Sequence, residues 1–131
     1  MAYGTLASDA IQSSTTGSPP QFNDGSGTQI GTLCRAWVKF AGSAGGATIG
    51  ASFNVTSVTR TGTGNYTIAF TNALTDANYA LQTSIGAAAN GNTWSFYESS
   101  GVTRTSSQVG VVFNASGTAF DPSVVSISVF R

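Results

Sequence analysis

The sequence contains no histidine and only one cysteine, Cys34, among its 131 residues. It therefore lacks the commonest general base and the commonest transition-metal ligand in proteins. A lone cysteine can form neither an intramolecular disulfide nor, without histidine, a Cys–His nucleophile. We therefore predict a protein that is not an enzyme and that holds no metal or other cofactor.

Charge is also scarce, since Asp, Glu, Lys and Arg together make up 8% of the residues, against about 25% in ordinary globular proteins. Five basic and five acidic residues cancel. We take the charges to be evenly spread, and without a basic stripe the chain is not expected to bind nucleic acid. Such weak repulsion favours contact between copies, so we expect an oligomer or a part of a larger assembly. The alternative is a small soluble domain covered in Ser, Thr and Asn.

Long apolar runs are missing as well. No run of 18 apolar residues is present, so we expect no segment that inserts into a membrane. The first residues lack the basic and apolar regions of a signal peptide. Together with the single cysteine, these features predict synthesis in a reducing cytosol.

What the sequence does contain is alternation, most clearly in residues 34–40. One set of positions holds Cys34, Ala36, Val38 and Phe40, and the other holds Arg35, Trp37 and Lys39. This two-residue period predicts a strand with one buried face, and it predicts that Cys34 is a buried free thiol. Trp37 between two cations on the opposite face indicates a partner. That partner is a sister subunit, an overlying loop or a sugar ring.

Similar alternation recurs along the chain, between breaks that are rich in turn-forming residues. No stretch of ten residues has helical spacing free of glycine or β-branched crowding. The expected strands are 33–40, 47–50, 52–60, 65–71, 78–86, 92–98, 107–113 and 123–130. About eight short strands at regular spacing predict an all-β protein whose body, residues 33–131, is an antiparallel β-sandwich or jelly-roll-like domain.

Residues 1–32 have a different composition, with few large apolar side chains among Ser, Thr, Gly, Gln and Asp. Pro19 and Pro20 exclude a helix there, and residues 23–25 predict a turn before the first strand. A segment of this kind buries too little to fold alone. It is either a flexible tail or an extended arm that becomes ordered on a neighbouring protein, and we favour the arm. Its docking residues would be Tyr3, Leu6, Ile11 and Phe22.

Three acids of the body could in principle supply paired catalytic carboxylates: Asp76, Glu98 and Asp121. Asp76 and Asp121 lie in turn sequences, where Asp commonly stabilises the turn. Glu98 ends an expected strand, and we expect it to meet Arg104 across the following turn. Structural roles are therefore predicted for all three.

A calcium site would require several clustered oxygen ligands. Asp76 with Asn72 and Asn78 is the best candidate in the sequence, and it is a weak one. We expect no bound metal.

Four motifs carry a resemblance to known proteins: Arg35-Ala-Trp37-Val-x-Phe40, Ser52-Phe53-Asn54-Val55-x-Ser57-Val58, Gly62-x-Gly64-x-Tyr66-Thr67 and Asp76-Ala-Asn78-Tyr79-Ala80. Across roughly residues 30–85 the chain resembles a small domain of virion proteins in tailed bacteriophages, most of all the distal domains of tail fibres and surface projections. Residues 3–6 with Asp9 and Ile11 also resemble the opening of fibre-like proteins of cyanobacterial phages.

The resemblance implies a virion structural protein with a β-sandwich body, often a homotrimer, at the virion surface and made in the host cytoplasm. Only about thirty residues precede the body, which leaves no room for a long fibre shaft. A capsid decoration (cement) protein or a short fibre-like projection is therefore favoured, with capsid or tail proteins as partners. The residues predicted to contact sister subunits are Arg35, Trp37, Lys39 and Phe130.

A second function remains open, that of an adhesin at a tail-fibre tip that binds glycan on the host surface. Such a site uses exposed aromatic and amide side chains on loops. The candidate glycan contacts are Asn90, Asn92, Trp94 and Tyr97.

Overall fold

The computed structural model describes residues 7–8, 10–14, 20–86 and 94–131, and these contain strands but no helix. The chain divides into two compact units, Met1–Leu33 and Cys34–Arg131. The first contains β1 (Phe22–Asn23) and β2 (Gln29–Gly31). The second, here called the body, contains β3 (Cys34–Ser43), β4 (Gly46–Phe53), β5 (Val55–Gly62), β6 (Asn65–Phe70), β7 (Ala80–Gly86), β8 (Trp94–Glu98), β9 (Gln108–Ala115), β10 (Thr118–Ala119) and β11 (Val124–Phe130).

The prediction of an all-β, sandwich-like protein is confirmed. Each expected strand has a counterpart, and β1, β2 and β10 are short additions of two or three residues. The expected break between the first two strands is shorter than predicted, because β3 continues to Ser43 and turns directly into β4. Gly42 permits this continuation: a Cβ atom there would lie 2.1 Å from the hydroxyl of Tyr66. The expected break at residue 51 is wrong, because β4 continues to Phe53 and β5 begins at Val55.

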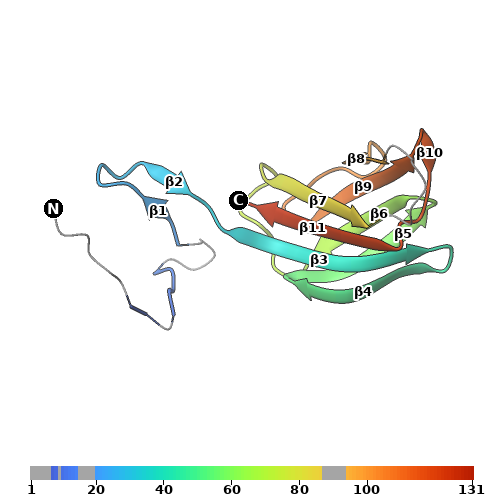
Figure 1. The fold of residues 1–131 in the computed structure, drawn as a ribbon. Coiled ribbons are helices and arrows are strands. Elements are labelled where there is room, and N and C mark those ends of the chain that lie inside the picture. Colours follow the sequence, from blue (N-terminus) through green and yellow to red (C-terminus); the bar gives the residue numbers. More distant parts are fainter. Residues whose placement is uncertain (1–6, 9, 15–19, 87–93) are drawn as a thin grey trace. The chain divides into compact units, whose positions relative to one another are not determined.

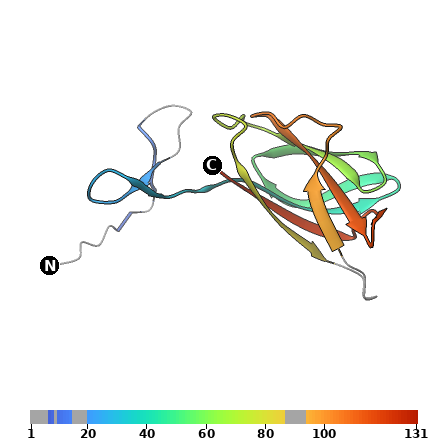
Figure 2. The ribbon, with the colours of Figure 1, turned by 90° about the horizontal axis from the view of Figure 1, so that it is seen from above.

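The body consists of two antiparallel sheets, seen as layers in Figures 1 and 2. One sheet has the strand order β4-β3-β11-β7. In the other, β5 pairs with β6, β6 with β9, and β9 also with β8 and β10. β3 and β11 are therefore central in their sheet, whereas β4 and β7 form its edges.

The core lies between the two sheets. Phe40 of the first sheet packs against Tyr66 and Phe113 of the second, with ring centroids 5.3 and 6.3 Å apart. In β3, Ala36, Val38 and Phe40 are at most 2% exposed, as the alternation predicts. Burying each large side chain contributes about 1.5–3 kcal/mol, so this double layer accounts for most of the fold's stability.

Cys34 differs from its prediction, because its free thiol is only partly buried. The pairing of β3 with β11 shifts by one residue here: Val129 lies opposite Ala36, but Phe130 lies opposite Cys34. Arg35 is left without a partner on β11, as the extra residue of a β-bulge. The alternation is interrupted at this point, so extrapolating it to the first residue of the strand was wrong.

In the first unit, β1 and β2 form a two-stranded antiparallel ladder, here called the arm hairpin. Oδ1 of Asp24 accepts hydrogen bonds from the backbone N–H groups of Ser26 and Thr28, both at 2.9 Å, and from the Ser26 hydroxyl at 2.7 Å. These hydrogen bonds, first that of the Ser26 hydroxyl, lower the pKa of Asp24. The expected turn exists, but it closes a hairpin within the arm.

Candidate interaction surface

The outer side of the sheet β4-β3-β11-β7 carries several exposed apolar side chains. Trp37 is 38% exposed and Phe53 is 55% exposed, and the two lie directly opposite each other on β3 and β4. Residues in register on neighbouring strands point to the same face, so these rings share one surface. Lys39 and Ala51 form the next outward pair, and Val124 of β11 is 41% exposed. We call this set of five residues the outer patch.

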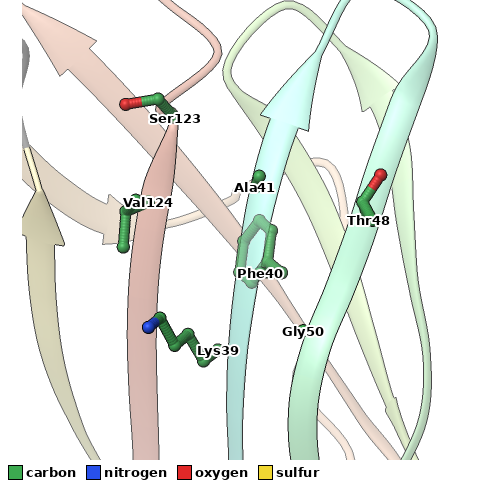
Figure 3. A pocket seen from close by; sticks show the side chains of 7 residues that line it. All are labelled: Lys39, Phe40, Ala41, Thr48, Gly50, Ser123 and Val124. Atoms are coloured by element: carbon green, nitrogen blue, oxygen red, sulfur yellow. The ribbon is translucent and has the colours of Figure 1, made fainter.

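A pocket of about 190 Å³ opens beside the outer patch and shares Lys39 and Val124 with it (Figure 3). It arises where the pairing of β3 with β4 shifts: Lys39 lies opposite Ala51, but Phe40 lies opposite Ile49, which leaves Gly50 unpaired. The absence of a side chain at Gly50 helps to leave the surface hollow. The lining residues are Lys39, Phe40, Ala41, Thr48, Gly50, Ser123 and Val124. In Figure 3 the Lys39 side chain extends from β3 toward β11, along one side of the hollow.

Next to the outer patch, β4 is an open sheet edge. Among the residues that the structure describes, β4 pairs only with β3, and its last six residues are all exposed. Natural proteins usually protect such edges with charges, prolines or covering segments, because unpaired N–H and C=O groups recruit further strands. β4 contains neither a charged residue nor a proline. It can therefore accept another strand.

Three ion pairs occupy all the acids of the body: Arg60 with Asp121, Arg104 with Glu98, and Arg131 with Asp76. In the part of the chain that the structure describes, the two remaining cations of the body, Arg35 and Lys39, form no ion pair, and both belong to β3. Nη1 of Arg35 is buried and has no hydrogen-bond partner among the described residues.

The charges are less evenly spread along the chain than predicted. Residues 1–33 contain Asp9 and Asp24 but neither Lys nor Arg. The body contains five basic residues and three acidic residues. Its excess of two positive charges corresponds to Arg35 and Lys39, the two cations of β3 that form no ion pair among the described residues and that flank Trp37 in sequence.

The four predicted subunit contacts all belong to β3 and β11. Trp37 and Lys39 lie in the outer patch, whereas Arg35 and Phe130 lie at the start of β3 and the end of β11 and are half-buried. The prediction omitted Phe53 and Val124, as well as the edge of β4. The sequence holds no direct signal for Phe53, because its position opposite Trp37 depends on the register between β3 and β4.

Of the predicted docking residues, Ile11 is 62% exposed and Phe22 is 42% exposed. Tyr3 and Leu6 lie outside the described residues. Ile30 of β2, at 70% exposed, was not among the predicted docking residues, although a large apolar residue in a polar segment could have been noticed.

Two predicted glycan contacts are described, and they lie on opposite faces of β8. The Trp94 ring packs on Phe120 at a centroid distance of 4.3 Å. Tyr97 is 47% exposed, and its hydroxyl accepts a hydrogen bond of 2.9 Å from the amide of Asn114. Successive residues of a strand point to opposite faces, so Trp94 and Tyr97, which are three positions apart, do not share a surface on which a sugar could bind. Asn90 and Asn92 lie outside the described residues.

Asp121 is the centre of a polar cluster that joins three segments of the body. Its carboxylate accepts two hydrogen bonds of 3.0 Å from Arg60, one of 2.6 Å from the Tyr66 hydroxyl and one of 3.0 Å from the Gly64 N–H. These interactions, with the Arg60 hydrogen bonds foremost, lower the pKa of Asp121 to about 2. Burial, together with the adjacent carboxylate, raises the pKa of Tyr66. A carboxylate held ionised in this way acts as a structural clamp.

The other two acids of the body also have structural partners. Glu98 pairs with Arg104, as the sequence predicts, and the Arg104 guanidinium lies 4.4 Å from the centroid of the Tyr79 ring. Asp76 accepts a hydrogen bond of 2.7 Å from the Asn78 N–H, which confirms its turn-forming role, and pairs with Arg131. Arg131 lowers the pKa of Asp76. No three residues among the described His, Cys, Asp and Glu cluster as metal ligands.

Comparison of the chain with known protein families, with curated proteins and with solved structures finds no match. The resemblance to phage virion domains therefore stays a prediction. Across the described residues, no helix has the length and apolar character required to cross a bilayer.

Proposed function

We propose that this chain is a non-enzymatic structural protein of a phage particle that works by assembling with other copies and with virion proteins. The observation that carries this proposal is the outer patch beside an open sheet edge. Exposed Trp37 and Phe53 lie together with an unprotected β4 and few charges to keep copies apart. Large exposed apolar patches of this kind mark interaction sites.

In this proposal the body forms a homotrimer, and the arm attaches it to the capsid or the tail. The protein then acts as a capsid decoration protein or as a short surface projection. The arm suits attachment because Ile11, which precedes the hairpin of β1 and β2, is exposed in a segment with few apolar contacts of its own. Burying this part of the arm against a virion partner would order it and hold the body on the particle.

The arrangement of the acids supports a role without catalysis. Each of Asp76, Glu98 and Asp121 is bound by a different arginine. The lowered pKa of Asp121 and of Asp76 keeps both carboxyls ionised at neutral pH, which is unsuited to a general acid. The described residues thus supply no pair of carboxylates free to act on one substrate.

The test of assembly is the mass of the purified full chain in solution as a function of concentration. We expect a trimer for the native chain, and a shift toward monomer when Trp37 and Phe53 are both replaced by serine. Tyr97→Ser is the matched control, because it removes an exposed aromatic side chain from the other sheet. A native chain that stays monomeric at every concentration, or a Trp37/Phe53 variant that assembles normally, would contradict the proposal.

The test of attachment uses virions that carry the protein. Removing residues 1–32 spares the core, because the core residues that the structure describes all belong to the body. We expect the shortened chain to be absent from virions imaged by electron microscopy, and the native chain to occupy defined positions on their surface. Normal decoration by the shortened chain would contradict the role of the arm.

Recognition of host glycan is the second candidate, and Tyr97 is the residue that favours it. An exposed aromatic ring fixed by the Asn114 amide is a suitable surface for a sugar ring. A glycan array probed with the native chain and with Tyr97→Ser distinguishes the two functions. An adhesin shows binding that is lost in the variant, whereas a decoration protein binds nothing.

A further inference from the structure

We infer that the arm hairpin of one copy docks on the β3–β4 side of the body of a second copy, adding its strands to the open edge of β4. The inference rests on the proposed function and names the contact by which copies assemble. It follows from three features: an incomplete hairpin, an open acceptor strand, and opposite charges on the two.

The donor is the arm hairpin, whose ladder contains only two and three residues per strand. An isolated hairpin in water is at best marginally stable, and it needs a third strand or a packing surface. Phe22 packs over Gly31, and a Cβ atom added to Gly31 would lie 3.3 Å from the Cβ atom of Phe22. The Phe22 side chain nevertheless remains 42% exposed. Ile30 is still more exposed. The hairpin therefore presents apolar side chains and unpaired strand edges together.

The acceptor is β4, which offers eight residues of strand with one edge free. Ile49 and Phe53 are exposed along it, so an added strand would gain apolar contacts as well as backbone hydrogen bonds. Strand addition of this type takes its affinity from the main chain and its specificity from side chains at alternate positions. β7, the opposite edge of the same sheet, has no comparable exposed aromatic residue.

Opposite charges on the arm and the body favour contact between them over contact between two arms or two bodies. The arm carries Asp9 and Asp24 and no basic residue, whereas the two unpaired cations of the body, Arg35 and Lys39, lie on the strand next to β4. Oδ1 of Asp24 accepts hydrogen bonds within the turn, and among the described residues Asp24 forms no ion pair. Two arms repel each other, as do two β3 surfaces, but an arm and a β3 surface attract.

The contact joins two different surfaces, the arm hairpin of one copy and the β3–β4 side of the next. Repeating it from copy to copy closes a ring when the rotation that relates neighbouring copies is a simple fraction of a full turn. A ring of three agrees with the trimer of the proposed function. Each copy in the ring would give one arm and receive another.

Cross-linking between two populations of the full chain tests the contact. Cys34→Ser removes the native thiol, after which Ile30→Cys is placed in one population and Ala51→Cys in the other. Thr59→Cys is the matched control acceptor, because it is an exposed position on β5, an edge strand of the other sheet. We expect the mixture of Ile30→Cys with Ala51→Cys to form cross-linked dimer at least several-fold faster than the mixture with Thr59→Cys.

The outcomes separate this inference from the proposed function. Equal rates for the two mixtures in an assembled protein would overturn the inference and leave assembly intact. A protein that stays monomeric would overturn both. A chain that carries both Ile30→Cys and Ala51→Cys, and that forms only an internal cross-link at high dilution while mixtures form none, would show the arm on its own body and would also overturn the inference.

Two substitutions test the forces involved. Phe22→Ser should weaken assembly by about tenfold, since an apolar side chain at the contact is lost. Ile11→Ser is its control, because Ile11 lies outside the hairpin, and it should leave assembly unchanged. Lys39→Glu should weaken assembly a few-fold at low salt and less at high salt. Assembly unaffected by Phe22→Ser and by Lys39→Glu would overturn the inference.

Discussion

The hydroxyl of Tyr66 donates a hydrogen bond of 2.6 Å to Oδ1 of Asp121, a residue 55 positions further along the chain. Asp121 lies just before β11, whereas Tyr66 is a core residue of β6. The bond therefore links the segment that leads into one sheet to a strand of the other. Arg60 binds the same carboxylate, so a single acid joins β5, β6 and the approach to β11.

Asp121→Asn should destabilise the body by about 2–3 kcal/mol, because it removes the charge that Arg60, Tyr66 and Gly64 all contact. Urea unfolding at neutral pH measures the loss. Glu98→Gln is the control: Glu98 is 43% exposed, and breaking its pair with Arg104 should cost about 1 kcal/mol or less. Equal losses in the two variants would contradict the central role of Asp121.

Stability should fall in acid through the same carboxyl. The pKa of Asp121 is about 2 in the folded chain, against 3.8 as the ordinary value, because Arg60 and the other donors favour the charged form. The stabilisation is therefore complete above about pH 4 and is lost as the pH falls toward 2. Urea unfolding between pH 5 and pH 2 should show the native chain approaching Asp121→Asn in stability. A constant difference between the two across this range would refute the assignment.

Gly64→Ala should destabilise the body by about 3 kcal/mol or more. Gly64 has a φ of +70°, and a Cβ atom there would lie 2.5 Å from the carbonyl oxygen of Phe113 and 2.9 Å from that of Phe120. Gly117→Ala is the control, because its φ is +83° but nothing lies within 4 Å of the added Cβ. It should cost only about 1–2 kcal/mol of backbone strain. Thermal unfolding measures the stability of the two variants. The difference between their losses gives the cost of the steric clash at Gly64 beyond the backbone strain that both variants share.

Substitution of Asn54, at the bend between β4 and β5, should destabilise the body. Asn54 has a φ of +54°, its amide nitrogen donates to the carbonyl oxygens of Arg35 at 3.0 Å and Asn72 at 3.1 Å, and its Oδ1 accepts from the Asn72 N–H at 2.7 Å. Asn54→Gly keeps the backbone conformation but loses these bonds, at a cost of about 2 kcal/mol. Asn54→Ala should cost about 1 kcal/mol more, through strain.

The comparison of Asn54→Gly with Asn54→Ala is made by urea unfolding. The control is Ser116→Gly. Among the described residues, Ser116 is the other non-glycine residue with a positive φ. Glycine relieves the backbone strain at this position, so the substitution should not destabilise the chain. Equal stability of Asn54→Gly and the native chain would mean that the side-chain bonds contribute nothing.

Much of the fold could be predicted because strand alternation is a local property. Val38 and Phe40 on one face of β3, and Val125, Ile127 and Val129 on one face of β11, are buried as their two-residue period indicates. The same period placed Trp37 and Lys39 on the outer face. Turn signals were also local: Gly64 has the positive φ that the hairpin between β5 and β6 requires.

The sequence by itself therefore determined that the protein is all-β, that strand residues two positions apart such as Val38 and Phe40 line its core, and that Trp37 faces outward. Only the tertiary structure decided that Cys34 is partly exposed, that β4 is an open edge, that Phe53 lies beside Trp37, and that Asp121 holds Arg60 and Tyr66. Alternation depends on the backbone of a few successive residues. Edges, bulges and long-range ion pairs depend on how distant strands pair, which no local pattern specifies.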